Sequence, residues 1–537
     1  MDRRGGFLHA LLLCSIVGAA GCSSPGDDAG QASAGTDGGS EGGSLDSGVG
    51  GSTGGGLETG LSGEGGDTGS ASAGAEDTGD VQPDDTGAEG SSSSTTGAPS
   101  CDETTPVELF LSPDDSNSMS SPVQAREAAL SQWASVSAAP IRTWEFFNYY
   151  SFDYPAAEPA SVVVTPSLVH DEGMPEGQYV LQIGISSEAI TPEQRPPMNL
   201  ALVLDTSGSM EGLAMDMLKA SCRTIAHNLR AGDQISLVTW NTENAILLGG
   251  HTVDGPDDPM LLEAIDSLSA SGGTDLSGGL QAGYDLAGQV YDPDRINRLV
   301  LISDGGANVG VTDVDLIAAQ AELSGGDGIY MVGVGVGEAG DYNDRLMDQV
   351  TDAGKGASIF IASEAEAQRI FGERFLSSLS VAVRDVQVEL DLPPGFEIVK
   401  FSGEEYSSNP SEVEPQHLAP NDAMVFHQQI STCAPALATD DAPIVVTARF
   451  EHPIAGTVQE VRVETSFGEL LAADATQLRK GAAVFAYAEG LKAYKAATDE
   501  AAQAAAVAQA RAAIVTAQAA LPGDADLLEM SSVLDAL

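Results

Sequence analysis

The stretch Asp205-Thr206-Ser207-Gly208-Ser209 decides how the rest of this sequence is interpreted. It follows the apolar run 200–204, and an amphipathic helical pattern begins beyond Gly212. A buried strand, a turn and a helix in that order are typical of an open α/β sheet. Ligands of such sheets bind outside the carboxyl ends of the strands, where this turn offers one carboxylate and two hydroxyl groups.

Two later loops carry the same kinds of side chain. Thr274 lies in the loop 271–275 before a helical pattern, and Asp304 directly follows the apolar strand pattern 299–302 and Ser303. If both strands lie side by side in one parallel sheet, five side chains converge: Asp205, Ser207, Ser209, Thr274 and Asp304. The set resembles the metal-ion-dependent adhesion site of von Willebrand factor type A domains, D-x-S-x-S with a later Thr and Asp. Three unrelated polar loops are the alternative.

The donor types predict the cofactor. Carboxylate and hydroxyl oxygens suit Mg²⁺, or Mn²⁺ or Ca²⁺, rather than Zn²⁺. Two carboxylates balance the charge of the ion, and Mg²⁺ keeps open positions for water. The resemblance implies that an Asp or Glu of a protein partner takes one of these positions. Which of Asp205 and Asp304 touches the metal directly stays open.

The chain has 537 residues and a net charge of −56, which argues against nucleic acid as a partner.

The N-terminal region has the composition of an export signal. Residues 1–22 combine Arg3 and Arg4 with a short apolar stretch and end in a segment that resembles a bacterial lipobox. We therefore expect lipidation of Cys22 and a bacterial cell-envelope location, in the outer membrane or at the cell surface, with the membrane contacted through the lipid only. Ordinary secretion with a free Cys22 is the alternative.

Composition and periodicity divide the remainder into segments. Residues 23–100 lack Lys and Arg and are rich in Gly, Ser and acidic residues, so we expect a disordered tether. The segments that follow are predicted as an N-terminal family segment with strands (101–196), a type A domain (197–377), an antiparallel β domain (378–470) and C-terminal helices (471–537).

The segment 141–155 strengthens the family resemblance. It is similar to the motif that precedes the type A domain in bacterial secreted proteins of the YfbK kind, and the residues that fit are Arg142, Glu145, Asn148, Tyr149, Tyr154 and Pro155. We interpret its aromatic residues as core rather than as a ligand site. Residues 179–185 alternate as a half-buried antiparallel strand does.

The expected fold class is α/β. A doubly wound, mostly parallel sheet is inserted in, or flanked by, an antiparallel β-sandwich, with a C-terminal helical segment and the N-terminal tether. If the first and last β segments share one sandwich, Cys101 and Cys433 could form a disulfide in an oxidising compartment. Two free thiols are the alternative, and Cys222 is expected to be buried and unpaired.

These features favour a non-catalytic binding protein of the cell envelope that holds a protein partner through a divalent metal. An accessory subunit of an envelope assembly is one alternative. A hydrolase is the other, and it is disfavoured because the chain has no H-E-x-x-H motif and its seven histidines are scattered.

Overall fold

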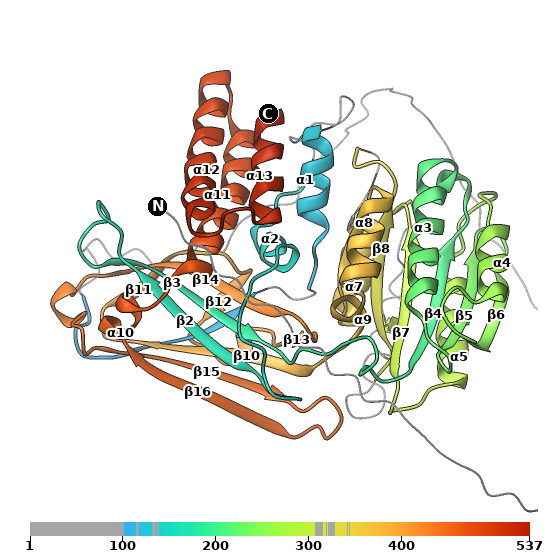
Figure 1. Cartoon of the computed structure of the whole chain (residues 1–537), viewed down its shortest axis with the longest axis horizontal. Coiled ribbons are helices and arrows are strands. Elements are labelled where there is room, and N and C mark those ends of the chain that lie inside the picture. Colours follow the sequence, from blue (N-terminus) through green and yellow to red (C-terminus); the bar gives the residue numbers. More distant parts are fainter. Residues whose placement is uncertain are drawn as a thin grey trace, which may run out of the picture. The chain divides into compact units, whose positions relative to one another are not determined.

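The computed structural model describes residues 101–113, 117–130, 136, 139–306, 315–317, 319, 328–340, 342 and 344–537 (Figure 1). The predicted signal segment, the predicted tether and the predicted lipidation site Cys22 lie outside the described residues. Among the helices that are described, none is both long enough and apolar enough to cross a bilayer.

A six-stranded sheet occupies the middle of the chain, with the strand order β6-β5-β4-β7-β8-β9. The strands are β4 (Met198–Asp205), β5 (Gln234–Trp240), β6 (Ala245–Thr252), β7 (Ile296–Ser303), β8 (Tyr330–Val336) and β9 (Ser358–Ile361). Neighbouring strands are parallel, except that β5 and β6 are antiparallel. Every residue of β4 and β7 is buried, as expected for apolar strands covered on both faces. The predicted, mostly parallel α/β sheet is confirmed.

Helices alternate with these strands along the chain. They are α3 (Leu213–Asn228), α4 (Pro259–Ser267), α5 (Leu276–Gln289), α7 (Arg345–Gly354), α8 (Glu364–Gln368), a π-helical turn (Arg369–Glu373) and α9 (Phe375–Leu379). Leu218, Cys222 and Ile225 of α3 are fully buried, which confirms the predicted apolar face. Helix α5 packs closely on the sheet: a Cβ added at Gly283 would lie 2.4 Å from Cγ2 of Val203.

Two antiparallel sheets form a sandwich (Figure 1). One sheet has the order β12-β1-β10-β15-β16, with β13 also paired to β10; its strands are β1 (Val107–Ser112), β10 (Val383–Leu392), β12 (Glu405–Ser407), β13 (Gln416–Leu418), β15 (Pro443–Glu451) and β16 (Val458–Ser466). The other has the order β11-β14-β3-β2; its strands are β2 (Val163–Val169), β3 (Gln178–Ser186), β11 (Phe396–Phe401) and β14 (Ala423–Thr432). Buried residues of both sheets, such as Val388 and Ile183, share one apolar core.

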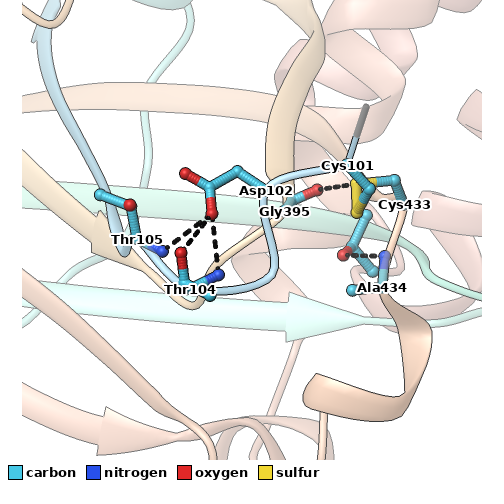
Figure 2. Close-up of a disulfide and its surroundings, with 8 residues drawn as sticks. Cys101, Asp102, Thr104, Thr105, Gly395, Cys433 and Ala434 are labelled. Atoms are coloured by element: carbon cyan, nitrogen blue, oxygen red, sulfur yellow. Dashed lines mark hydrogen bonds between the residues drawn. A yellow bond between two sulfur atoms is a disulfide. The ribbon is translucent and has the colours of Figure 1, made fainter. Parts of the chain in front are cut away.

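The α/β unit is inserted into this sandwich. Strand β1 pairs with β10, and β3 pairs with β14, so strands from before and after the α/β unit form the same sheets. Cys101 and Cys433 are joined by a disulfide, with their Cα atoms 5.8 Å apart (Figure 2). The predicted insertion and the predicted disulfide are confirmed, and Cys222 is buried and free, as expected.

Strand β3 differs from its prediction. Residues 181–186 are all buried, whereas alternation predicted one exposed face. The second face is covered because the Gln182 side chain donates to the Tyr154 hydroxyl at 2.8 Å and to the Gln477 carbonyl at 2.9 Å. Gly184 leaves room for the Tyr154 ring, since an added Cβ would lie 2.3 Å from the Tyr154 Cζ atom.

Most of the remaining helices pack together beside the sandwich, and the first of the C-terminal ones packs against β2 and β16. The C-terminal ones are α10 (Phe467–Ala472), α11 (Thr476–Ala496), α12 (Glu500–Ala520) and α13 (Ala525–Ala536), and the N-terminal ones are α1 (Ser120–Leu130) and α2 (Thr143–Tyr149). Phe146 of α2 meets Tyr487 of α11 edge-on, with ring centroids 5.6 Å apart. Phe146, Phe147, Tyr149 and Tyr150 are buried, which confirms that this aromatic cluster is core.

A buried ionic cluster ties these helices to the α/β unit. Arg126 of α1 lies 2.7 Å from the Glu366 carboxylate of α8 and 3.4 Å from Glu529 of α13. The Tyr149 hydroxyl also contacts Glu366, at 3.1 Å. These ion pairs therefore connect α1, α8 and α13, which are distant from one another in sequence.

Candidate metal centre

Asp205 is the last residue of β4 and is completely buried. Its Oδ1 atom accepts a hydrogen bond from the Ser207 backbone N–H at 2.8 Å. Its Oδ2 atom accepts from the Ser303 hydroxyl at 2.6 Å. These two bonds fix the carboxylate at the carboxyl end of the strand, and each oxygen retains a lone pair for a further interaction.

The two hydroxyl groups of the loop lie next to each other. Ser207 Oγ and Ser209 Oγ are 3.1 Å apart. Two ligands at right angles around Mg²⁺, each at 2.0–2.1 Å, lie about 3 Å apart. The separation of the two hydroxyl oxygens therefore fits adjacent positions around one octahedral cation.

Asp304 reaches the same place from the neighbouring strand. β7 lies parallel to β4 with Ile302 opposite Leu204, so both strands end at the same edge of the sheet. The Asp304 Oδ1 atom accepts from the Gly306 N–H at 2.9 Å. A Cβ added at Gly306 would lie 3.0 Å from Asp304 Oδ1 and 3.3 Å from Ser209 Oγ. Asp304 and Ser209 therefore flank one small space that glycine leaves open.

The loop that carries Thr274 is hydrogen-bonded to the D-x-S-x-S loop. The Gly208 N–H donates to the Gly272 carbonyl at 3.2 Å, and the Ser271 N–H donates to the Thr206 carbonyl at 2.7 Å. Thr274 itself is exposed, and within the described part of the chain no hydrogen bond joins its side chain to the other four predicted residues. The structure thus groups Asp205, Ser207, Ser209 and Asp304 and places the Thr274 loop beside them.

The electrostatics of the site favour a cation. Burial raises the pKa of the Asp205 carboxyl, and the nearby Asp304 carboxylate raises it further, whereas the hydrogen bonds from Ser303 and Ser207 oppose these effects. The ionised form of a buried carboxylate is unfavourable when a second carboxylate lies nearby and no positive charge compensates them. A divalent cation would remove that cost, so the donor set and its charge both fit a metal ion.

Several supporting residues could not be recognised from the sequence. Ser303 holds Asp205 from β7, and the Asn241 amide donates to the Thr206 hydroxyl at 3.1 Å. The Asp275 N–H donates to the Asn241 carbonyl at 2.7 Å, which connects the third loop to β5. Ser303 was identifiable only as a polar residue at the end of an apolar strand, and nothing in its spacing indicated Asp205 as its partner.

Residues 200–307 match the sequence profile of the von Willebrand factor type A domain, VWA_2. This segment contains most of β4, all of β5 and β7, and all five predicted metal ligands. The inserted α/β unit is therefore a type A domain, a class that often binds a divalent metal at its adhesion site.

Two bacterial proteins show the wider relationship. YfbK of Escherichia coli (strain K12) is 28% identical over 264 residues, which are 48% of this chain and 45% of that protein. The protein sll0103 of Synechocystis sp. is 26% identical over 228 residues, 42% of this chain and 52% of that protein. This chain is thus related to both, and each match spans about half the length of the relative.

Two solved structures show partial similarity to this chain. A von Willebrand factor type A protein from Catenulispora acidiphila has a TM-score of 0.44 at 17% identity, covering 71% of this chain and 98% of that one. Proximal thread matrix protein 1 of the mussel byssus, with a zinc-occupied adhesion site, has a TM-score of 0.26 at 14% identity, covering 33% and 46%.

Proposed function

We propose that this chain is a non-catalytic binding protein that holds a divalent cation, Mg²⁺ in the first place and Mn²⁺ or Ca²⁺ otherwise. Asp205, Ser207, Ser209, Thr274 and Asp304 would hold the ion. The observation that carries the proposal is the 3.1 Å separation of the Ser207 and Ser209 hydroxyl oxygens beside two carboxylates at one sheet edge. These are the hard oxygen donors that such cations prefer.

The bound cation would supply a positive charge for an acidic side chain. The chain carries 79 Asp and Glu against 23 Lys and Arg, so its surface repels an acidic partner in general. A cation with an open coordination position reverses the charge locally. We therefore infer that the partner is a protein that places an Asp or Glu carboxylate on the metal. Type A domains commonly mediate protein interactions, which supports this class of function.

Affinity capture from cell envelopes tests this function. The full chain is used as bait in Mg²⁺ and again after EDTA treatment, beside the variants Asp205→Ala and Asp266→Ala. Asp266 is a suitable control, because its side chain is exposed and pairs with the exposed Arg223. The expected result is a partner retained in Mg²⁺ by the parent and by Asp266→Ala, and lost with EDTA or Asp205→Ala. A partner retained equally by all variants and conditions contradicts the proposal.

We also propose that the chain is anchored to a bacterial envelope membrane by lipidation of Cys22. The support is the arginine-containing, short apolar segment that ends in Gly21-Cys22 and precedes the polar stretch 23–100. Cys22→Ser should move the protein to the soluble fraction or leave an unprocessed precursor. Unchanged detergent partitioning of that variant rules out the lipid anchor.

A further inference from the structure

A second charged site lies at the opposite end of the type A sheet. A cavity of about 290 Å³ is lined by residues at the start of β7 and β8, by Arg384 of β10 and by the turn between β15 and β16. The candidate metal centre lies at the carboxyl ends of β4 and β7, so the two sites are separated by the length of the strands. The cavity joins the type A domain to the sandwich.

Arg298 is one of the side chains that line this cavity. It is only 6% exposed, and its guanidinium lies over the Tyr330 ring, 4.9 Å from the ring centroid. Its Nη1 atom donates to the Asn297 carbonyl at 2.8 Å, and a guanidinium has five N–H donors in all. Among the described residues, no carboxylate forms an ion pair with it. Burial lowers the pKa of Arg298 to about 10, and the Tyr330 side chain opposes that effect.

Further donors line the same cavity. Arg384 is 3% exposed and lies 3.5 Å from Glu451. The His452 Nδ1 atom accepts from the backbone N–H groups of Ile454 and Ala455, each at 3.1 Å. A neutral His452 ring therefore carries its proton on Nε2, where it is a donor.

The positive charge of both arginines acts on a neighbouring histidine. Burial lowers the pKa of the neighbouring His417 to about 3, and positive charge on Lys355, Arg298 and Arg384 lowers it further. Glu188 and Asp294 also line the cavity, and Asp294 is exposed to solvent. Two buried arginines in one cavity are notable in a chain whose acidic residues outnumber the basic ones by 79 to 23.

We propose that this cavity binds a small oxyanion, a phosphate or carboxylate group, with Arg298 as the bidentate donor and Arg384 and His452 as further donors. Guanidinium groups bind both kinds of anion through two parallel hydrogen bonds. A buried arginine without a counter-ion is costly, and an anion in the cavity would offset that cost. The ligand would contact the type A domain and the sandwich at once.

Calorimetric titration of the full chain tests the proposal. Inorganic phosphate and malonate are titrated separately, in low-salt buffer from which divalent cations have been removed, so that the candidate metal centre plays no part. We expect saturable binding of at least one anion. Phosphate alone would identify a phosphate site, malonate alone a carboxylate site, and both a general oxyanion site.

Variants then locate the binding. Arg298→Met should weaken the affinity by about 10- to 100-fold, since it removes charge-assisted hydrogen bonds. Arg223→Met changes an exposed arginine of the same domain and should bind as the parent does. Arg298→Lys keeps the positive charge without the planar guanidinium, so its anion affinity should lie between those of the parent and Arg298→Met. This second variant keeps the test valid if Arg298→Met does not fold. Failure of the parent chain to bind either anion overturns the proposal, and so does undiminished affinity in a folded Arg298→Met or Arg298→Lys variant.

Discussion

Cys101 and Cys433 are 332 residues apart in sequence and are joined by a disulfide (Figure 2). Cys101 precedes β1, and Cys433 directly follows β14, so the bond links the two sheets of the sandwich. The side chain of Asp102 stabilises the turn after Cys101, because its Oδ1 atom accepts from the Thr104 N–H at 2.9 Å and the Thr105 N–H at 3.2 Å. The whole type A domain lies within the loop that this disulfide closes.

Removing the disulfide should destabilise the protein. A variant with both Cys101→Ser and Cys433→Ser should lose about 2–5 kcal/mol of unfolding free energy, because the unfolded chain is no longer cross-linked. Denaturant unfolding of the oxidised parent and the variant measures the difference. The buried Cys222 takes no part in the bond and is left unchanged in both proteins. Equal unfolding midpoints for the double variant and the parent contradict this prediction.

Acid should destabilise the protein through His427. Burial lowers the pKa of His427 to about 3, and its Nδ1 atom lies 2.8 Å from the Gln182 Oε1 atom. The unfolded chain binds a proton near the ordinary pKa of about 6.5, whereas the native state does not. The unfolding free energy should therefore fall as the pH drops from about 6.5 towards 3, by at most about 1.4 kcal/mol per pH unit for this residue.

Denaturant unfolding at a series of pH values measures this effect. His427→Gln removes the titrating group, so its profile should be flatter in this window than that of the parent. His227→Gln is the control, because the His227 side chain is mostly exposed. Parallel profiles for the parent and His427→Gln would show that His427 is not the group responsible.

The buried ion pair between Arg126 and Glu366 should matter more than a surface pair. Glu366 is 2% exposed, so Arg126→Met leaves its carboxylate buried and without that partner, at a cost of about 3–5 kcal/mol. Arg511→Met breaks an exposed pair with Asp535 and should cost about 0–1 kcal/mol. Denaturant unfolding compares the two variants. Similar small losses in both would mean that Glu366 is accommodated without Arg126.

Local patterns predicted much of the fold. The apolar run before Asp205 and the spacing of Leu218, Cys222 and Ile225 on α3 predicted a strand and a helix of an α/β unit, because burial imposes these periods directly. The sequence did not predict β11, β12 and β13 between residues 393 and 422, since the last two have only three residues each. The sequence also did not predict that the second face of β3 is buried, because that burial depends on Tyr154 and Gln477 from distant segments.

The residues of the candidate metal centre could be predicted from the sequence, whereas the side chains that support them could not. Asp205, Ser207 and Ser209 are close in sequence, and Asp304 follows the strand that neighbours theirs, so sheet topology brings these four together. Contacts such as that from Ser303 to Asp205 depend on side-chain orientation across two strands. Sequence spacing does not determine that orientation. The anion cavity depends in addition on residues from the type A domain and from the sandwich.

Ser303 is expected to position Asp205 rather than to bind the ion. Ser303→Ala removes the hydrogen bond to Asp205 Oδ2, and it should weaken metal affinity by about 10- to 100-fold without abolishing it. Ser267→Ala is the control, because that hydroxyl is exposed and donates to the Ala264 carbonyl of its own helix. Calorimetric titration with Mn²⁺ measures both. Unchanged affinity in Ser303→Ala would remove Ser303 from the site.

Direct titration of the full chain with Mg²⁺ and Mn²⁺ tests the metal centre most directly. The parent and Asp266→Ala are expected to bind one divalent ion at the site, and Asp205→Ala is expected to bind none while keeping the circular dichroism spectrum of the parent. The alanine change removes a fully buried carboxylate beside Asp304, whereas the Asp266 carboxylate is exposed. Normal binding of both ions by a folded Asp205→Ala variant would contradict the assignment of the metal to this site.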